Sequence, residues 1–257
     1  MKAFALVTGA SSGIGYCYAR ELASRGYGII AVSNDEAALN EKAGIIRKDF
    51  GVEVDAVVMD LSAQSAPLDL YGHCLEHGYE VEFLVNNAGV YHDRDFLDDS
   101  AEFNTLILML HVHAPAMLQY YFSKDMVSRG RGFIINMSSV TSSFGAQRLA
   151  TYSSTKSFLK MFSRATHVEL YGKGVNVTCV RPGAIATGLY NLRPSAVRAG
   201  LVLGYIMRPE KLAGKAVRAA FRGRAQLTPG FFTLVLQILV ALIPTAGLRL
   251  IRRWRIF

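Results

Sequence analysis

Thr8-Gly9-Ala10-Ser11-Ser12-Gly13-Ile14-Gly15 is the stretch of the chain that decides its fold. It follows the apolar run Phe4 to Val7 and precedes a helical pattern over residues 13–26. A glycine motif between a strand and a helix is typical of a phosphate-binding turn. In such a turn Gly9 allows the tight bend, Gly13 lets the backbone approach a pyrophosphate, and Gly15 lets helix and strand pack closely. We therefore predict that the amino terminus of this helix, with its free N–H groups, faces a phosphate-bearing ligand.

Apolar runs alternate with amphipathic stretches along most of the chain. Strands are predicted at residues 4–7, 28–32, 54–59, 81–85, 133–137 and 175–180, and helices at about 13–26, 35–50, 65–78, 101–129 and 152–172. The strands are continuously hydrophobic rather than alternating, which is typical of parallel strands covered on both faces. No Pro/Ser-rich linker interrupts the sequence, so residues 1–257 are predicted to form one α/β domain around a doubly wound, mostly parallel sheet. Its ligand should bind outside the carboxyl ends of the strands.

Composition and charge narrow the class of protein. A hydrophobic fraction of 51% with 19% charged residues supports a substantial core. The formal charge of +8 comes largely from the last 65 residues, and without a nucleic-acid-binding motif it does not indicate a nucleic-acid partner. Cys17, Cys74 and Cys179 fit neither a metal site nor a disulfide framework. The apolar run before Thr8 is too short for a secretory signal, so we expect a cytoplasmic protein.

Tyr152 and Lys156 form the candidate catalytic pair. Their spacing of four residues places both side chains on one face of a helix. A free tyrosine has a pKa near ~10, and a neighbouring ammonium lowers that pKa by favouring the phenolate. Tyr152 could then exchange a proton with a substrate oxygen. Ser138 and Ser139 follow the predicted strand 133–137, where a hydroxyl could reach the same oxygen.

Six linked motifs resemble the short-chain dehydrogenase/reductase family over roughly residues 3–190. They are Thr8-Gly9-x-x-x-Gly13-x-Gly15, Asp60, Asn86-Asn87-Ala88-Gly89, Ser139, Tyr152-x-x-x-Lys156 and Pro182-Gly183, in the order of the family. The resemblance implies a Rossmann-type fold and hydride transfer between a nicotinamide cofactor and a carbonyl or alcohol carbon. It also implies that Ser139 polarises the carbonyl, that Tyr152 transfers the proton, and that Lys156 tunes Tyr152 and binds the nicotinamide ribose.

The resemblance also assigns cofactor contacts along the chain. Asp60 and Leu61 resemble the pair that holds the adenine. The loop that lines the adenosine ribose corresponds to Asn87, Ala88 and Gly89. The segment that holds the carboxamide corresponds to Pro182, Gly183, Ile185 and Thr187. The glycine turn adds Gly9, Ser11, Ser12, Gly13, Ile14 and Gly15. Asn86 is either part of this loop or a tie between neighbouring strands.

His111 is where the chain departs from the family pattern. The family usually has an asparagine at this position, which supports a water in a proton relay to the lysine. An imidazole can also hold a water and titrates near neutrality. His111 is therefore a candidate catalytic residue, with the absence of a relay as the alternative.

The choice between NADP and NAD depends on Ser33 and Asn34 at the end of the second strand. An acid here would pair with the ribose 2′-hydroxyl and select NAD, whereas a basic residue would accept a 2′-phosphate. Neither Ser33 nor Asn34 is charged, and Asp35 lies one position further on, where it could cap the next helix. We expect NADP as the preferred cofactor, with NAD as the alternative.

The carboxyl-terminal quarter is apolar and basic. Residues 188–212 occupy the place of the family's substrate lid and predict an apolar substrate, such as a fatty-acyl or steroid-like ketone. Packing in the core is the alternative for most of their apolar side chains, which are Leu189, Tyr190, Leu192, Val197, Leu201, Leu203, Tyr205, Ile206 and Met207. Residues 231–248 are uncharged, and arginines follow them. The arm over residues 231–257 either lies on a membrane surface, packs on protein, or spans a membrane.

These features predict an NADP-preferring oxidoreductase that interconverts a ketone and a secondary alcohol on an apolar substrate. The alternatives are an NAD-linked alcohol dehydrogenase and a non-catalytic cofactor-binding sensor or scaffold. By analogy with the family, we expect the protein to form a homodimer or homotetramer through the helices near residues 101–129 and 152–172.

Overall fold

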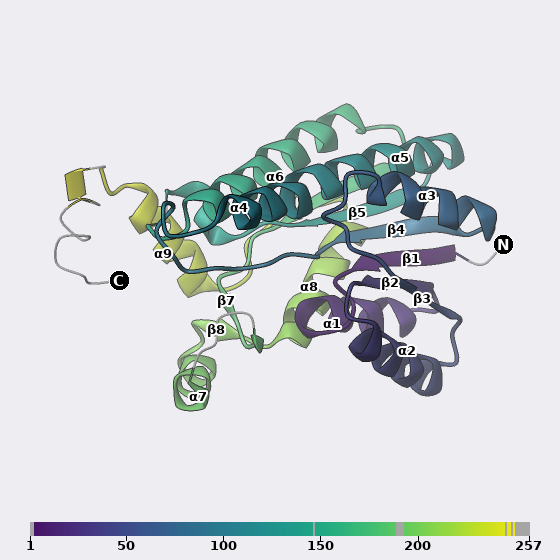
Figure 1. Ribbon diagram of the computed structural model, residues 1–257, viewed down its shortest axis with the longest axis horizontal. Coiled ribbons are helices and arrows are strands. Elements are labelled where there is room, and N and C mark those ends of the chain that lie inside the picture. The colour runs from purple at the N-terminus through teal and green to yellow at the C-terminus, as the bar shows by residue number, and fades with distance from the viewer. Residues whose placement is uncertain (1–2, 146, 189–192, 245, 248, 250–257) are drawn as a thin grey trace.

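A seven-stranded parallel sheet forms the centre of the computed structural model, which describes all residues except 1–2, 146, 189–192, 245, 248 and 250–257 (Figure 1). The strands are β1 (Ala3–Thr8), β2 (Gly28–Ser33), β3 (Val54–Val58), β4 (Glu80–Asn86), β5 (Gly132–Met137), β6 (Val175–Val180) and β9 (Gln226–Leu227). Their order in the sheet is β3-β2-β1-β4-β5-β6-β9, and every neighbouring pair is parallel. The predicted doubly wound α/β fold is therefore confirmed.

Helices cover both faces of this sheet. On one face lie α1 (Gly13–Ala23), α2 (Glu36–Phe50) and α8 (Pro209–Phe221), and on the other α3 (Ala66–Glu76), α4 (Ala101–Leu108), α5 (Ala114–Arg129) and α6 (Ala150–Glu169) (Figure 1). Two buried clusters fill the space between the layers. β1 and β2 are almost wholly buried, as their continuous hydrophobicity predicts. The strand order reverses between β1 and β4, so a crevice opens at their carboxyl ends.

The predicted helix over residues 101–129 is interrupted by a π-helical turn, η1 (Met109–His113). The amide of Ala114 donates to the carbonyl of Met109, five residues back instead of four. Pro115 lies in the first turn of α5 and has no N–H for a bond to the carbonyl of residue 111. The wider turn therefore bulges where proline removes a regular helical bond, and π-bulges often occur at functional sites.

Several elements after residue 180 were not predicted. They are the two-residue strands β7 (Ala184–Ile185), β8 (Ile206–Met207) and β9, together with α7 (Pro194–Leu203) and α8. α9 (Phe231–Ala241) occupies part of the uncharged stretch 231–248. Within the part of the chain that the structure describes, no helix combines the length and the apolar character needed to cross a membrane. Residues 250–257 of the predicted arm lie outside the described residues.

Candidate active site

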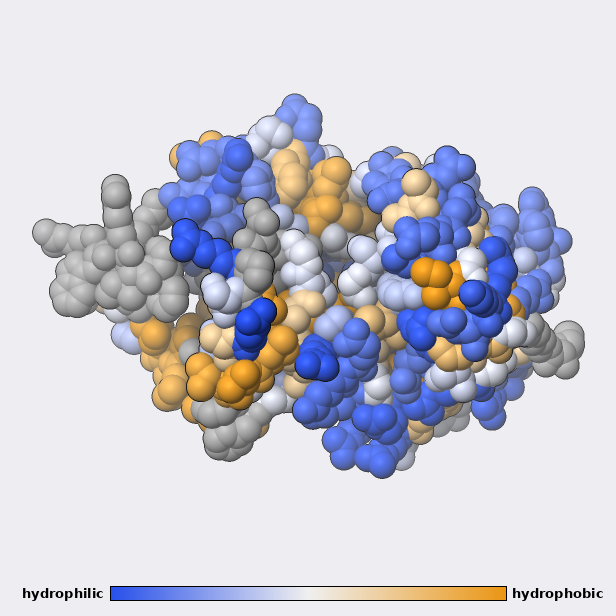
Figure 2. Space-filling view, turned by 90° about the horizontal axis from the view of Figure 1, so that it is seen from below, coloured by the Kyte–Doolittle hydropathy of each residue, from blue (hydrophilic) through white to orange (hydrophobic). Residues whose placement is uncertain are grey.

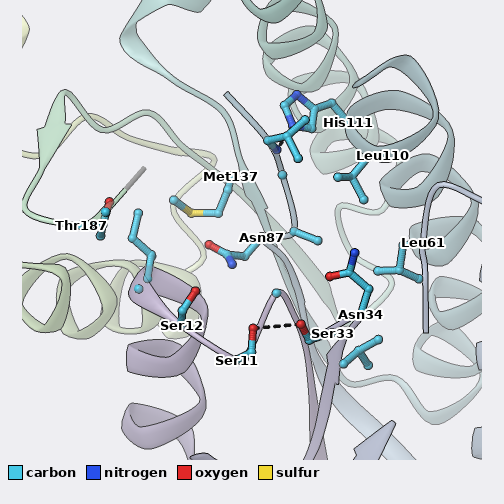
Figure 3. A pocket seen from close by; sticks show the side chains of 18 of the residues that line it. Ser11, Ser12, Ser33, Asn34, Leu61, Asn87, Leu110, His111, Met137 and Thr187 are labelled. Atoms are coloured by element: carbon cyan, nitrogen blue, oxygen red, sulfur yellow. Dashed lines mark hydrogen bonds between the residues drawn. The ribbon is translucent and has the colours of Figure 1, made fainter. Parts of the chain in front are cut away.

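A cleft of about 460 Å³ lies at the carboxyl ends of β1, β2, β4 and β5, at the predicted switch point (Figure 3). Most of the predicted cofactor residues line it, namely Gly9, Ser11, Ser12, Gly13, Ile14, Ser33, Asn34, Asp60, Leu61, Asn87, Ala88, Gly89, Tyr152, Lys156, Pro182 and Thr187. Figure 3 shows that these side chains come from both sides of the cleft, with Thr187 facing the wall that Asn34 and Leu61 form. Segments far apart in the sequence therefore meet at one site.

The glycine turn forms one end of the cleft. Gly9 and Gly13 have positive φ angles of 68° and 52°, which favour glycine. A Cβ on Gly15 would lie 2.0 Å from the carbonyl oxygen of Gly9, so this position tolerates no side chain. Ser12 precedes α1 and makes no side-chain cap bond, so the first N–H groups of α1 are not capped by that side chain at the edge of the cleft, which Ser12, Gly13 and Ile14 line. Gly15 thus shapes the turn without lining the cleft.

Thr8 fastens the β4–α4 loop to this turn. Its Oγ1 accepts hydrogen bonds from the amides of Asn87 and Ala88, both at 2.9 Å, and donates to the carbonyl of Val85. Asn87 Nδ2 donates back to the carbonyl of Thr8 at 3.0 Å. These bonds hold the predicted ribose loop against the turn.

Asn86 acts as a tie between strands, which is one of the two roles that the sequence left open. Its Nδ2 donates to Asn136 Oδ1 at 2.8 Å on the neighbouring strand and to the carbonyl of Pro115 at 3.3 Å. Asn86 Oδ1 is buried without a hydrogen-bond partner among the described residues. It borders a second cavity of about 10 Å³, also lined by His111 and Lys156, which is close to the size of one water.

Ser33 and Asn34 lie where the predicted choice between NAD and NADP is made. Ser33 Oγ donates to Ser11 Oγ at 2.9 Å (Figure 3) and accepts from the amide of Asp35. Asn34 is exposed on the wall of the cleft. The carboxylate of Asp35 accepts from the amide of Ala38 and caps α2, as predicted. Asp35 is not among the residues that line the cleft.

Tyr152 and Lys156 lie one turn apart on α6 and are both buried, with 8% and 5% of their surface exposed. Lys156 Nζ lies 5.5 Å from the centre of the Tyr152 ring and donates to the carbonyl of Met137 at 3.0 Å. Burial lowers the pKa of Lys156 to about 8, because an ammonium loses its hydration there. The predicted pair is therefore brought together at the inner wall of the cleft.

The two serines after β5 make different contacts. Ser138 Oγ donates to the carbonyl of Lys156 at 2.7 Å, which anchors α6 to β5. Ser139 begins the short 3₁₀ helix η2 (Val140–Ser143), and its Oγ accepts from the amide and the hydroxyl of Thr141. Ser138 borders the cleft itself, whereas Ser139 lies beside it and is also buried.

Gly183 and Ile185 do not line the cleft, in contrast to the sequence-based expectation. Ile185 is buried in β7, and a Cβ on Gly183 would lie 2.8 Å from Thr233 Oγ1. Their neighbours Pro182 and Thr187 do reach it. The segment therefore reaches the cleft at its two ends, Pro182 and Thr187, and not at Gly183 or Ile185.

The described apolar side chains of the predicted lid lie apart from the cleft wall. Leu189, Tyr190 and Leu192 are outside the described residues. Ile206 is buried, Val197, Leu201 and Met207 are partly buried, and Leu203 and Tyr205 are exposed. None of these six described side chains lines the cleft, to which the 188–212 segment contributes Gly188. Its apolar side chains instead lie on β8 and on α7 with the loop that follows it.

His111, for which the sequence left open either a water relay or no relay, hydrogen-bonds to protein groups through both ring nitrogens. Its Nε2 accepts from the amide of Val90 at 3.0 Å, and its Nδ1 lies 3.2 Å from Thr155 Oγ1. Burial, and secondly the charge of Lys156, lower the pKa of His111 well below its usual 6.5. Both ring nitrogens are therefore used by protein groups, and the ring offers neither of them to a relay water.

Several residues of the cleft were missed by sequence reasoning. Apolar side chains make up most of them, namely Val32, Met59, Val90, Leu110 and Met137. Tyr91 packs edge-on against Tyr152, with ring centres 5.3 Å apart. In the sequence these residues look like ordinary strand, helix or loop residues, and only the three-dimensional arrangement distinguishes them.

Comparison with known proteins agrees with this geometry. A family model described as short chain dehydrogenase matches residues 3–196. The very-long-chain 3-oxoacyl-CoA reductase of Anas platyrhynchos is 33% identical over 200 residues, covering 76% of this chain and 64% of the relative. The protein of the same name from Phaeosphaeria nodorum is 35% identical over 200 residues, with 76% and 58% covered. The chain therefore spans less than two thirds of the length of these relatives.

Solved structures give the same assignment. A short-chain dehydrogenase from Sphingobium yanoikuyae, determined in complex with NADPH, is 28% identical with a TM-score of 0.79, covering 89% of this chain and 88% of its own. The bulky-bulky ketone specific alcohol dehydrogenase from Comamonas testosteroni is 28% identical with a TM-score of 0.77, covering 89% and 86%. The family match, the strand order and the glycine turn facing a Tyr-x-x-x-Lys pair agree: the chain belongs to the short-chain dehydrogenase family.

Proposed function

We propose that this protein is an NADP-preferring oxidoreductase that interconverts a ketone and a secondary alcohol on a fatty-acyl 3-oxo substrate. The observation that carries this proposal is the arrangement of the cleft, with a phosphate-binding turn at one end and the buried Tyr152–Lys156 pair on its inner wall. The names of the relatives support a 3-oxoacyl substrate. The complex of a structural neighbour with NADPH supports the cofactor.

The residues of the cleft fit a dinucleotide. The amino terminus of α1 and the glycine turn suit the pyrophosphate, because both present backbone N–H groups to an anion. Asp60, Leu61, Asn87, Ala88 and Gly89 would hold the adenosine, and Lys156 the nicotinamide ribose. When bound, the reduced nicotinamide supplies the hydride. Pro182 and Thr187 would hold the carboxamide at the other end.

Three side chains would act on the substrate oxygen. Ser139 Oγ accepts from Thr141 and keeps its own proton for the carbonyl oxygen. Tyr152 donates a proton to the oxygen as its negative charge develops, which is general acid catalysis. Lys156 lies beside the Tyr152 ring and favours the phenolate that remains. In the reverse direction, Tyr152 takes the proton from the alcohol.

Two alternatives from the sequence are separable by experiment. An NAD-linked alcohol dehydrogenase would use the same three residues in the oxidative direction, and a steroid-like ketone is the alternative substrate. A cofactor-binding sensor would bind NADPH without turnover. Purified protein is mixed with NADPH, and oxidation is followed by absorbance with 3-oxoacyl-CoA thioesters of increasing chain length and with steroid ketones. Rates that rise with acyl length support the proposal, whereas NADPH binding without oxidation by any ketone supports the sensor.

Asn34→Asp is expected to reverse the cofactor preference. A carboxylate on this exposed wall would repel the 2′-phosphate of NADPH and pair with the 2′-hydroxyl of NADH. We expect the Kd for NADPH to rise about tenfold or more, since a like charge at about 4 Å near a surface costs on the order of 1–4 kcal/mol. Nicotinamide fluorescence titrations measure both cofactors. Asn40→Asp on the exposed surface of α2 is the matched control; an unchanged NADPH Kd in Asn34→Asp would remove Asn34 from the cofactor site.

We further propose that residues 1–257 form one domain that assembles as a homodimer or homotetramer. The support is a set of exposed apolar side chains on α4, α5 and α6, namely Leu108, Tyr120, Phe158, Met161 and Val168. A second copy would bury them, as symmetric oligomers bury matching surfaces. Sedimentation equilibrium distinguishes dimer, tetramer and monomer.

The carboxyl-terminal arm is proposed to contact a membrane surface while the catalytic domain stays in the cytoplasm. Leu234, Val235, Leu239 and Leu242 are exposed, and Glu210 is the last acidic residue of the chain. Figure 2 shows hydrophobic side chains gathered at the left end of the molecule, where Figure 1 places α7 and α9. An apolar helix followed by arginines suits an anionic lipid surface. The alternative is packing against a partner protein.

Vesicle binding tests this surface. We expect the protein to sediment with phosphatidylcholine vesicles that contain phosphatidylserine, and less with phosphatidylcholine alone, because arginines attract anionic headgroups. The double variant Leu239→Glu with Leu242→Glu should stay in the supernatant. Leu75→Glu on α3, where the side chain is equally exposed, is the matched control. Equal sedimentation of all three proteins would contradict a membrane-binding face on α9.

A further inference from the structure

His111 is held between the cofactor side and the catalytic side of the cleft. We propose that it is a positioning residue that couples the loop at Gly89 and Val90 to Tyr152, through a neutral imidazole protonated at Nδ1. The side chain is 1% exposed and projects from η1, the π-helical turn. This inference rests on the proposed function, because that function assigns the Gly89–Val90 loop to the cofactor and Tyr152 to the substrate.

The hydrogen bonds fix the tautomer of the ring. The amide of Val90 can only donate, so Nε2 of His111 must be the acceptor at 3.0 Å. The hydroxyl of Thr155 donates to the carbonyl of Tyr152 at 2.7 Å, so its oxygen is left to accept from Nδ1–H at 3.2 Å. One chain of bonds therefore runs from Val90 through His111 and Thr155 to Tyr152. An imidazolium would turn Nε2 into a donor and break the bond to Val90.

Packing on both sides of the ring supports the same role. A Cβ on Gly89 would lie 2.7 Å from His111 Nε2, so only glycine lets the loop approach the imidazole. On the other side, the ring meets Tyr152 edge-on, with centres 5.7 Å apart and planes at 75°. Tyr91 packs edge-on against Tyr152 as well. Tyr152 is thus oriented by two rings, one of which is bonded to the cofactor-side loop.

The charged surroundings favour a neutral ring. Lys156 and Tyr152 are the titratable groups of α6 near His111, and the cationic form of Lys156 disfavours a second cation. Two further neighbours of His111 are uncharged. Val90 of the β4–α4 loop donates to the ring, and Asn86 at the end of β4 lines the adjoining cavity. In that cavity the unpartnered acceptor is Asn86 Oδ1. A water-sized ligand there would therefore bond to Asn86, while the imidazole serves the coupling.

The tautomer is tested directly by nuclear magnetic resonance. The protein is labelled with ¹⁵N-histidine, and His111→Phe identifies the signal of His111 among the six histidines. We expect a neutral ring protonated at Nδ1, unchanged over about one pH unit on either side of 6.5, where an ordinary histidine titrates. A ring protonated at Nε2, or one that titrates in this range, would overturn the inference. This readout needs neither cofactor nor turnover, so it stays decisive if the proposed function fails.

Two conservative variants separate the two ends of the coupling. His111→Asn keeps an amide donor near the place of Nδ1 and loses the acceptor for Val90, whereas His111→Gln keeps an acceptor near the place of Nε2 and loses the donor to Thr155. We expect His111→Asn to raise the NADPH Kd about tenfold with kcat little changed, and His111→Gln to lower kcat about tenfold with NADPH Kd little changed. His111→Phe should do both. If all three variants only lower the melting temperature and leave kcat and Kd as in the parent protein, the ring is merely structural and the coupling is refuted.

Discussion

Tyr152→Phe is expected to lower turnover about 10³-fold while NADPH binding stays within about twofold of the parent protein. The change removes only the phenol oxygen, which is the atom that we propose exchanges a proton with the substrate. The ring itself is kept, so its edge-on contacts with Tyr91 and His111 persist and the cleft keeps its shape. Steady-state oxidation of NADPH gives the turnover, and fluorescence titration gives the Kd.

Tyr171→Phe is the matched control for this variant, because Tyr171 is 83% exposed just beyond α6. It should retain full turnover. A Tyr152→Phe protein that still oxidises NADPH at the parent rate would show that another group supplies the proton. A loss of NADPH binding in the same variant would instead assign Tyr152 to cofactor binding alone.

Lys156→Met is expected to reduce turnover about 10²- to 10⁴-fold and to make the cofactor-free protein more stable. Methionine keeps an unbranched side chain of similar length, but it cannot lower the pKa of a neighbouring phenol or bind a ribose. In the parent protein, burial holds the pKa of Lys156 at about 8, below the 10.5 of an exposed lysine. Below pH 8 the folded protein therefore keeps a buried cation, which costs on the order of 3 kcal/mol.

The pH dependence of stability follows from the sign of this shift. Between pH 8 and 10.5 the unfolded chain binds a proton at Lys156 that the folded chain has lost, so the contribution of Lys156 to stability rises with pH through this range. The buried cysteines, whose pKa values are raised, contribute with the opposite sign in all of the proteins compared. Lys156→Met should lack that gain, and Lys173→Met, an exposed position, should keep it. Thermal unfolding at several pH values measures the difference. Equal slopes for the parent protein and Lys156→Met would contradict the buried cation.

The predictable part of the fold rests on strong local signals. Residues 3–180 have apolar strands of five or more residues and α-helices of eight or more, and the glycine turn fixes how the first two elements meet. The later strands β7, β8 and β9 have two residues each, too few for any periodicity. α8 was not predicted from the sequence, because most residues of its buried face are alanines, whose small side chains give only a weak hydrophobic pattern. In that helix, the burial of small side chains depends on contacts with α1 that only the assembled structure provides.

The candidate site was predictable where a residue's role depends on its neighbours in sequence. Tyr152 and Lys156 share a helix face, and Gly9 and Gly15 share a turn, so spacing alone brings each pair together. Gly183 and Ile185 were assigned to the cleft by resemblance, but Ile185 is buried in β7 and Gly183 packs against Thr233. The partners of His111 come from Val90 and Thr155, which lie 21 and 44 residues away. No local pattern indicates contacts over such separations.

The central claim is that this cleft transfers a hydride to the carbonyl of an acyl substrate. It is tested most directly with NADPH that carries deuterium at the transferring position, mixed with a long-chain 3-oxoacyl-CoA, followed by mass spectrometry of the product. We predict a 3-hydroxyacyl-CoA with one deuterium on the carbon that bore the ketone, formed by the parent protein and not by Tyr152→Phe. Unchanged 3-oxoacyl-CoA after prolonged incubation with protein that binds NADPH would contradict the account.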